Sequence, residues 1–382
     1  MEQSNAMYNA TRAAKADFYP SIYNEGTLQY SLTGNDISLG GETMPLKRYA
    51  YSLSTNIAQP ILTGGKIRNT YEAAKIKWQM AEENVQQIFD DIVRQAQTIY
   101  WNAAAKRDMY TTACQYVDII NRLTTVLQDK YEAGAIGKTD LLQMQTRLAE
   151  AQLQRSASLL AYRQAVQAMN TLMGRDPDTQ TQPGDSLSDK TPMPIIIDLE
   201  TALNMRSDYA IHRLQTEYQK RQMALALAEH KPTLSIGLQQ QWGTPLINTS
   251  GKPKLSPIVF AKAHFPMFRW GKRAKSIATQ RALLNETILA QNDKYDQIDL
   301  EVATSLAAVQ ENYKQITYAN ENNRLAQENL EINTLSYTEG RLTILDVLAA
   351  QLTWIQARNS LIQTQFNYRM AVADYFHATG TN

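Results

Sequence analysis

Residues 60–66 read Pro-Ile-Leu-Thr-Gly-Gly-Lys, and residues 266–272 read Pro-Met-Phe-Arg-Trp-Gly-Lys, so proline, glycine and lysine return at matching places. The tetrapeptides that begin at Tyr131 and Tyr337, each closed by a glycine, are separated by the same 206 residues. A spacing that stays constant over such a length is hard to obtain by chance. We therefore interpret the chain as two copies of one unit, which has to be recognised before any fold is assigned.

The spacing changes upstream of this stretch. Pro20 matches Pro232, which lies 212 residues later, so the first copy carries six additional residues between its two prolines. A helical pattern from about 199 to 229 precedes Pro232, whereas only the residues before Asp17 correspond to it in the first copy. We expect the sequence to begin partway into its first helix, and a signal peptide to have preceded it.

These spacings divide the chain into three parts. Residues 1–174 are predicted to form the first repeat and residues 198–382 the second, and the copies match without insertion over 60–174 and 266–380. The segment between the repeats, 175–197, is predicted to be a linker because prolines interrupt any regular structure there. These prolines are Pro177, Pro183, Pro192 and Pro194.

Each copy is predicted to contain one very long helix. From Ile67 to Tyr131 there is no proline and no glycine, and apolar residues return at alternating spacings of four and three, as in the seam of a left-handed coiled coil. A helix of this extent is about 95–100 Å long at the standard rise. The second copy repeats the pattern. In the first copy the seam begins with Ile67, Tyr71, Ala74, Trp78, Ala81, Val85, Ile88 and Ile92.

A short turn separates each long helix from a return helix. In the first copy the long helix ends at Gly134, the turn covers 135–139, and the return helix runs from about 140 to 173. In the second copy Thr343, followed three residues later by Asp346, predicts a capping box at the start of the return helix. Each copy is therefore expected to form a helical hairpin with a glycine at its tip.

The strands are expected between the paired prolines. Four runs of about ten residues lie there, and this is the length that a tilted strand needs to cross a membrane. Four strands are too few to close a barrel, and an open sheet edge is not tolerated in lipid. Several chains must therefore pool their strands if the sheet enters a membrane. The alternating or apolar residues that mark these runs lie at 28–32, 49–57, 234–238 and 257–265.

The composition excludes several classes of protein. A net charge of +1 lacks the basic excess of a nucleic-acid binder, and no run approaches the eighteen apolar residues of a spanning helix. Cys114 is the one cysteine, which excludes an intrachain disulfide and a thiolate metal cluster. We find no nucleophile, metal or cofactor constellation, so neither an enzyme nor a cofactor is expected. The histidines, interpreted as surface or packing residues, are His212, His230, His264 and His377.

Gly65-Lys66 and Gly271-Lys272 resemble part of a phosphate-binding loop. The Walker spacing is absent, and no serine or threonine follows either lysine. We interpret both pairs as turns from a strand into a helix.

The ordered set of motifs resembles the TolC-like outer-membrane efflux protein family over nearly the whole chain. The resemblance implies a fold class that is mainly α with β, in which the chain is a tandem-repeat subunit of an α-helical barrel. The resemblance implies a homotrimer in which four strands from each subunit form one outer-membrane β-barrel in contact with lipid. It also implies a helical duct through the periplasm, loaded by an inner-membrane transporter through a periplasmic adaptor, with no nucleic acid involved.

The resemblance assigns roles to the hairpin tips. Links between an aspartate on one tip and a tyrosine on the other hold the family's closed entrance, together with an acidic ring. The corresponding gate candidates here are Asp140, Tyr337, Asp346 and, as the counterpart of Tyr337, Tyr131. Three copies of an aspartate around an axis favour cations and repel anions. The candidates for adaptor contact are Gly134, Ala135, Ile136, Gly137, Gly340, Arg341, Leu342 and Thr343.

Simpler interpretations stand beside these. Asp140 and Asp346 each lie at a helix start, where the dipole and the exposed amides stabilise a carboxylate without any gate. Tyr131 and Tyr337 can also pack the last turn of their helices. For the whole chain, the alternative to an export duct is a soluble coiled-coil scaffold or adaptor without channel activity.

Overall fold

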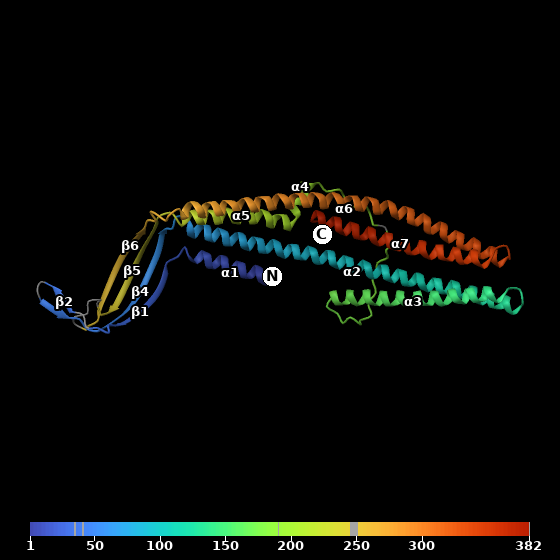
Figure 1. The fold of residues 1–382 in the computed structure, drawn as a ribbon, viewed down its shortest axis with the longest axis horizontal. Coiled ribbons are helices and arrows are strands. Elements are labelled where there is room, and N and C mark those ends of the chain that lie inside the picture. The colour runs from blue at the N-terminus through green and yellow to red at the C-terminus, as the bar shows by residue number, and fades with distance from the viewer. Residues whose placement is uncertain (34–35, 40–41, 190, 245–250, 382) are drawn as a thin grey trace. The chain divides into compact units, whose positions relative to one another are not determined.

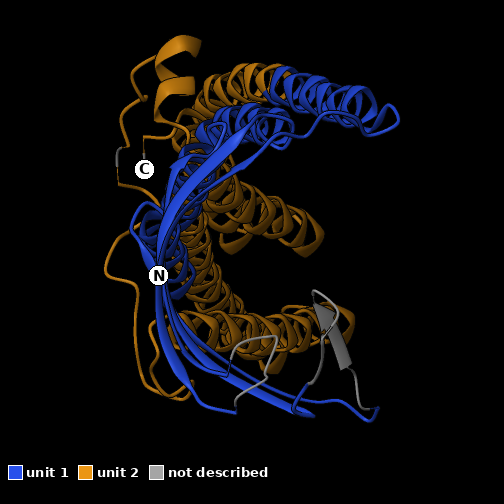
Figure 2. Cartoon of the chain, turned by 90° about the vertical axis from the view of Figure 1, so that its left-hand side faces the viewer, with its two compact units in different colours: residues 1–85, 208–294 blue, residues 86–207, 295–382 orange. Residues whose placement is uncertain are grey.

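The computed structural model describes residues 1–33, 36–39, 42–189, 191–244 and 251–381. The chain divides into two compact units, coloured separately in Figure 2. Unit 1 comprises Met1–Val85 and Asp208–Lys294, and unit 2 comprises Gln86–Ser207 and Tyr295–Asn382. Each unit takes residues from both sequence repeats, so the repeat boundaries describe the duplication and not the compact units.

Unit 1 carries a four-stranded antiparallel sheet in the order β1-β4-β5-β6. The register confirms the duplication, because Ser21 lies opposite Ala58, and the residues 212 and 206 positions later, Thr233 and His264, also lie opposite each other. The first two of these residues belong to β1 and β4, and the other two to β5 and β6. The strands are β1 (Ser21–Tyr30), β4 (Tyr49–Leu62), β5 (Thr233–Gly243) and β6 (Lys254–His264).

The strands differ from the prediction in detail. Strand β4 has 14 residues and not ten. Pro257 lies inside β6, where an edge strand tolerates a residue without an N–H. A second hairpin, of β2 (Asp36–Leu39) and β3 (Glu42–Pro45), was not predicted.

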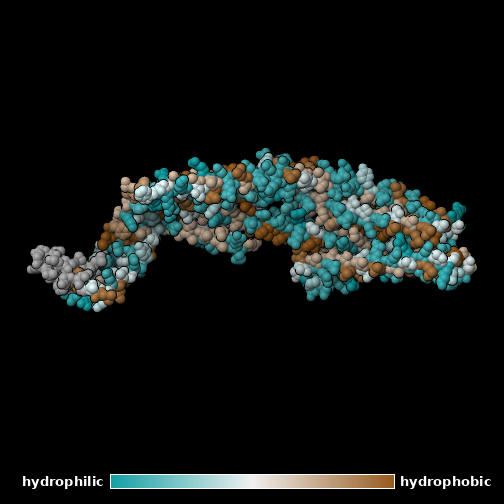
Figure 3. Space-filling model, in the orientation of Figure 1, coloured by the Kyte–Doolittle hydropathy of each residue, from teal (hydrophilic) through white to brown (hydrophobic). Residues whose placement is uncertain are grey.

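The sheet exposes many apolar side chains. Figure 3 shows apolar residues among polar ones over the strands. Patches of this kind on a protein surface mark a contact with a membrane or with another chain. The large apolar side chains that are exposed include Ile22, Leu28, Tyr30, Leu53, Trp242, Leu255 and Val259.

Glycines make the turn that joins the sheet to each long helix, as expected. Gly65 and Gly271 have φ values of 90° and 74°, and the helices begin at the lysines that follow them. This left-handed conformation favours glycine because a Cβ is strained there. The two Gly-Lys pairs are therefore strand-to-helix turns.

The long helices are confirmed. Helix α2 covers Lys66–Glu132 and α6 covers Lys272–Thr338, each with 67 residues. Their return helices are α3 (Lys138–Leu172) and α7 (Ile344–Thr379), and α1 (Glu2–Ala16) precedes β1. In unit 2 the ends of both hairpins share one apolar core, and Figure 1 shows their turns at the same end. Among the described residues, no helix is both apolar and long enough to cross a membrane.

One helix prediction was wrong. The helical pattern from about 199 to 229 forms two helices, α4 (Leu199–Met205) and α5 (Ser207–Ala228), which are separated by Arg206. Arg206 is extended, with ψ of 117°, and its guanidinium is almost completely buried against Glu301 and the carbonyl of Ala378. These tertiary contacts break the helix at a residue that has no unfavourable helix propensity of its own.

Candidate functional site

Both hairpin tips in unit 2 end their long helices with the same hydrogen-bonded turn. The amide of Ala135 donates to the carbonyl of Lys130 at 2.8 Å, and the amide of Arg341 donates to that of Ser336 at 2.9 Å. Gly134 and Gly340 have φ values of 69° and 77°, so each tip is a Schellman motif closed by glycine. The two glycines kept by the repeat are thus explained by backbone geometry.

The residues predicted to contact an adaptor lie around these turns. Most of them are exposed, whereas Ile136 packs against the apolar core beneath the tip. A Cβ added to Gly134, Gly137 or Gly340 would meet no described atom within 4 Å, so there is open space next to these three glycines. Arg341 forms an ion pair with Glu339 at 3.2 Å. The backbone of the two tips is alike, and their side chains differ.

Asp346 closes the predicted capping box. Its carboxylate accepts hydrogen bonds from the amide and the hydroxyl of Thr343 at 3.0 and 2.7 Å. These bonds lower the pKa of Asp346 below its usual range, so the exposed side chain stays ionised. The first copy has Gly137 at the same N-cap, which offers no hydroxyl to its own aspartate, Asp140.

The structure brings three residues of the two tips together. Tyr337 is 6% exposed, the ammonium of Lys130 lies 4.8 Å from the centre of its ring, and Asp140 lies close enough to act on its hydroxyl electrostatically. Burial, and then the charge of Asp140, raise the pKa of Tyr337. The tyrosine hydroxyl is buried and has no hydrogen-bond partner among the described residues.

Tyr131 and Tyr337 occupy matching positions but differ in environment. Tyr131 is 37% exposed, whereas Tyr337 belongs to the core of unit 2. The packing interpretation therefore describes Tyr337 and does not describe Tyr131. Both tyrosines stand three residues before the glycine of their turn, and this shared spacing does not distinguish the buried one from the exposed one.

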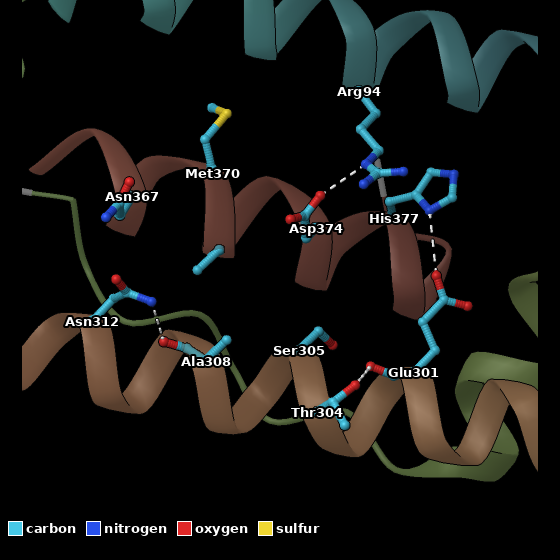
Figure 4. A pocket seen from close by; sticks show the side chains of 11 residues that line it. Arg94, Glu301, Thr304, Ser305, Ala308, Asn312, Asn367, Met370, Asp374 and His377 are labelled. Atoms are coloured by element: carbon cyan, nitrogen blue, oxygen red, sulfur yellow. Dashed lines mark hydrogen bonds and ion pairs between the residues drawn. The ribbon is translucent and has the colours of Figure 1, made fainter. Parts of the chain in front are cut away.

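A cluster of charged residues in unit 2 escaped sequence analysis (Figure 4). The Nε of Arg94 on α2 lies 2.8 Å from Asp374 on α7, and His377 on α7 lies 3.1 Å from Asp91 on α2 and 3.9 Å from Glu301 on α6. Arg94, Asp374, His377 and Glu301 line a cavity of 530 Å³. His377 was expected to have a surface or packing role, and it instead joins three helices through carboxylates. An i, i+3 spacing of Asp374 and His377 on one helix face was the available signal.

We expect the stability that His377 contributes to fall as the pH rises. Glu301 and Asp91 raise the pKa of His377, so its stabilisation is complete below the unfolded-state pKa of about 6.5 and is lost as pH rises through the folded-state pKa. Glu301 sets the acid limit: His377 and then Arg206 lower its pKa to about 2, so its contribution is lost as the pH falls toward that value. The substitution His377→Gln should lower the free energy of unfolding by roughly 1 kcal/mol more near pH 6 than near pH 9. The measurement is the difference in Tm between wild type and variant, which should be larger near pH 6. Equal differences at the two pH values would contradict this.

Solved structures of outer-membrane channels share this fold. The outer membrane protein VceC of Vibrio cholerae matches with 19% identity and a TM-score of 0.84, covering 100% of this chain and 91% of that one. The CmeC outer membrane channel of Campylobacter jejuni matches with 16% identity and a TM-score of 0.82, covering 99% and 81%. The open state of the MtrE outer membrane channel of Neisseria gonorrhoeae matches with 17% identity and a TM-score of 0.81, covering 99% and 84%. No curated protein sequence matches the chain.

The duplicated helical hairpins and the four-stranded sheet give this chain the fold of those solved structures. The sequence profile described as "Outer membrane efflux protein" matches residues 2–175 and 199–381. The chain belongs to this outer membrane efflux protein family. The membership favours an efflux channel of the outer membrane over the soluble scaffold.

Proposed function

We propose that this chain is the subunit of a homotrimeric duct that exports cargo across the outer membrane. The observation that carries the proposal is the four-stranded sheet, in which β1 and β6 each pair on one side only among the described residues. Unpaired edges in lipid leave backbone amides and carbonyls without partners, so the strands of several subunits must close a barrel. Three subunits with four strands each would give twelve strands, enough to enclose an aqueous lumen.

The cargo would reach this duct from an inner-membrane transporter through a periplasmic adaptor. The exposed tips support this step, because Ala135, Arg341 and Leu342 stand on rigid glycine-closed turns and present side chains to a partner. The difference in side chains between the tips would let a partner distinguish the two hairpins. The protein itself would catalyse no reaction.

The entrance would be gated where the two tips meet. In this proposal Asp140 and Tyr337 hold the hairpins of one subunit together, and the exposed, ionised Asp346 contributes to a negative ring. The buried hydroxyl of Tyr337 supports the link, because a buried donor gains most from a charged acceptor. Lys130 would hold the aromatic ring in place through its cation–π contact.

Single-channel recording in a planar bilayer tests both the duct and the gate. We expect the double variant Asp140→Ala with Tyr337→Phe to conduct several-fold more than wild type, because it lacks both partners of the link. Tyr131→Phe is the matched control, since this tyrosine is the exposed counterpart, and its conductance should equal that of wild type. Equal conductance of the double variant would remove Asp140 and Tyr337 from the gate. A wild-type protein that fractionates as a soluble monomer would contradict the duct itself.

A further inference from the structure

The turn between β6 and α6 holds a tryptophan in an unfavourable conformation. Trp270 has a φ of 44°, in the left-handed region, and it is 91% exposed. Its ring meets that of Phe268 edge to face, with the ring centres 5.0 Å apart, and Phe268 is itself 72% exposed. A bulky residue at positive φ is strained, and such strain persists where something outside the local backbone favours it. Within the chain, little apolar burial offsets this strain.

The first copy shows what lies next to this turn. The counterpart of Trp270 is Gly64, and a Cβ added there would lie 2.5 Å from the Cβ of Lys231 and 3.1 Å from the carbonyl oxygen of Ala228. Ala228 ends α5, and Lys231 lies two residues before β5 begins at Thr233. Thus the first turn packs closely against the residues that lead into the next strand of the sheet.

Strands β4 and β6 also end at different places in the two copies, because only β4 has a neighbouring strand on that side in the part of the chain that the structure describes. Strand β4 continues to Leu62 because β5 pairs with its last residues, with Gln59 opposite Ile236 and Leu62 opposite Leu234. The counterparts in the second copy, residues 265–268, follow the end of β6 and have no regular structure. Among the described residues no strand lies beyond β6 to pair with them. The second copy therefore lacks the neighbour that the first copy has.

The repeat identifies the missing neighbour by residue. The spacing of 212 that relates β1 to β5 makes Tyr19 the counterpart of Lys231, and Ile22 the counterpart of Leu234. Tyr19 is 62% exposed and Ile22 is 70% exposed, and they lie just before and within β1, at the opposite edge of the sheet. Each edge of the sheet thus carries an exposed apolar segment, residues 265–268 after β6 at one edge and Tyr19 with Ile22 at the other.

We infer that Trp270 of one subunit packs on Tyr19 of a second copy of this chain, and that Phe268 extends β6 beside Ile22 of that copy. The inference rests on the proposed assembly and names the side chains that anchor its seam. Within a chain, glycine permits a close approach to Lys231; between chains, two aromatic rings fill a wider gap. Tryptophan and tyrosine are the residues that most often dominate interface energies. The strain at Trp270 is then offset when the subunits assemble.

Cysteine cross-linking in the outer membrane tests the contact. In a Cys114→Ser background, the pair Tyr19→Cys with Trp270→Cys should give covalent dimers and trimers on a denaturing gel after mild oxidation or treatment with a short bis-maleimide. Either single variant should give none. A matched pair, Tyr318→Cys with Trp270→Cys, uses a tyrosine that is 72% exposed on α6 and should also give none. If trimers are present by native mass but the first pair does not cross-link, the inference is wrong and the proposed function stands. If wild type is monomeric, the proposed function fails.

The substitution Trp270→Gly gives an independent readout, because it restores the residue of the first copy and relieves the strain. If the ring anchors the seam, dissociation of the trimer in detergent should become at least tenfold faster. If the ring has no partner subunit, the variant should be more heat-stable with unchanged dissociation, which would overturn the inference. Quenching of Trp270 fluorescence by brominated phospholipids, measured against Trp270→Phe, would also overturn it by showing that lipid covers the ring.

Discussion

Replacing Arg206 by alanine should destabilise unit 2 by about 2–3 kcal/mol, less than the 3–5 kcal/mol of a fully buried pair because water reaches Glu301. The guanidinium is 6% exposed and lies 2.6 Å from Glu301, which is 42% exposed. It also donates to the carbonyl of Ala378 at 3.0 Å, near the end of α7. Its loss leaves the carboxylate without its nearest cation and the carbonyl without this donor. Thermal unfolding of the purified protein, followed by circular dichroism, measures the effect.

Arg324→Ala is the matched control for this experiment. Arg324 also pairs with two acids, Glu321 at 2.8 Å and Glu328 at 3.0 Å, but all three side chains are more than half exposed on α6. Exposed ion pairs contribute little, so we expect no measurable loss of stability. The interpretation of Arg206 is wrong if the two variants behave alike.

The substitution Tyr375→Ala should be more damaging, with a loss of about 3–5 kcal/mol, as for other large aromatic residues in a core. Tyr375 is fully buried, and its hydroxyl accepts a hydrogen bond from the amide of Ile197 at 2.9 Å and donates to the carbonyl of Ile195 at 3.3 Å. These hydrogen bonds join the proline-rich linker to α7, and the buried ring holds the hydroxyl in place. We expect the linker to become sensitive to protease under native conditions, which limited proteolysis measures.

Tyr375→Phe separates the two contributions of this residue. It keeps the buried ring and removes the hydroxyl, so the expected loss is only about 1 kcal/mol, the net value of a typical hydrogen bond. Resistance of the linker to protease should fall only slightly. A loss as large as that of the alanine variant would mean that the hydrogen bonds, and not the ring, hold the linker.

The sequence predicted the regular parts of the fold because each of them depends on residues that are close together in the chain. The absence of proline and glycine from Ile67 to Tyr131 gave the long helix, and Gly134 and Gly340 gave the turns. The capping box of Thr343 and Asp346 was also predictable, since both partners lie within one turn. The hairpin of β2 and β3 was missed because its strands are only four residues long.

The candidate site was only partly predictable. Sequence and resemblance named Asp140, Tyr337 and Asp346, and the structure places the first two near each other, which does not itself test a gate. Lys130 was missed, since its contact with Tyr337 joins residues that are distant in the chain. The cluster around His377 was missed for the same reason, because Asp91, Glu301 and His377 come from three helices.

The sequence by itself determined the duplication, the lengths of the two long helices, the glycine-closed tips and the two strand hairpins of the four-stranded sheet. These features depend on interactions between residues close in the chain, and the repeated spacing reports them twice. The tertiary structure alone decided that Arg206 breaks a helix, that Tyr337 is buried while Tyr131 is exposed, and that Trp270 is exposed with a positive φ. Each of these depends on which residues pack against one another across the fold, and such contacts join residues that are distant in the sequence.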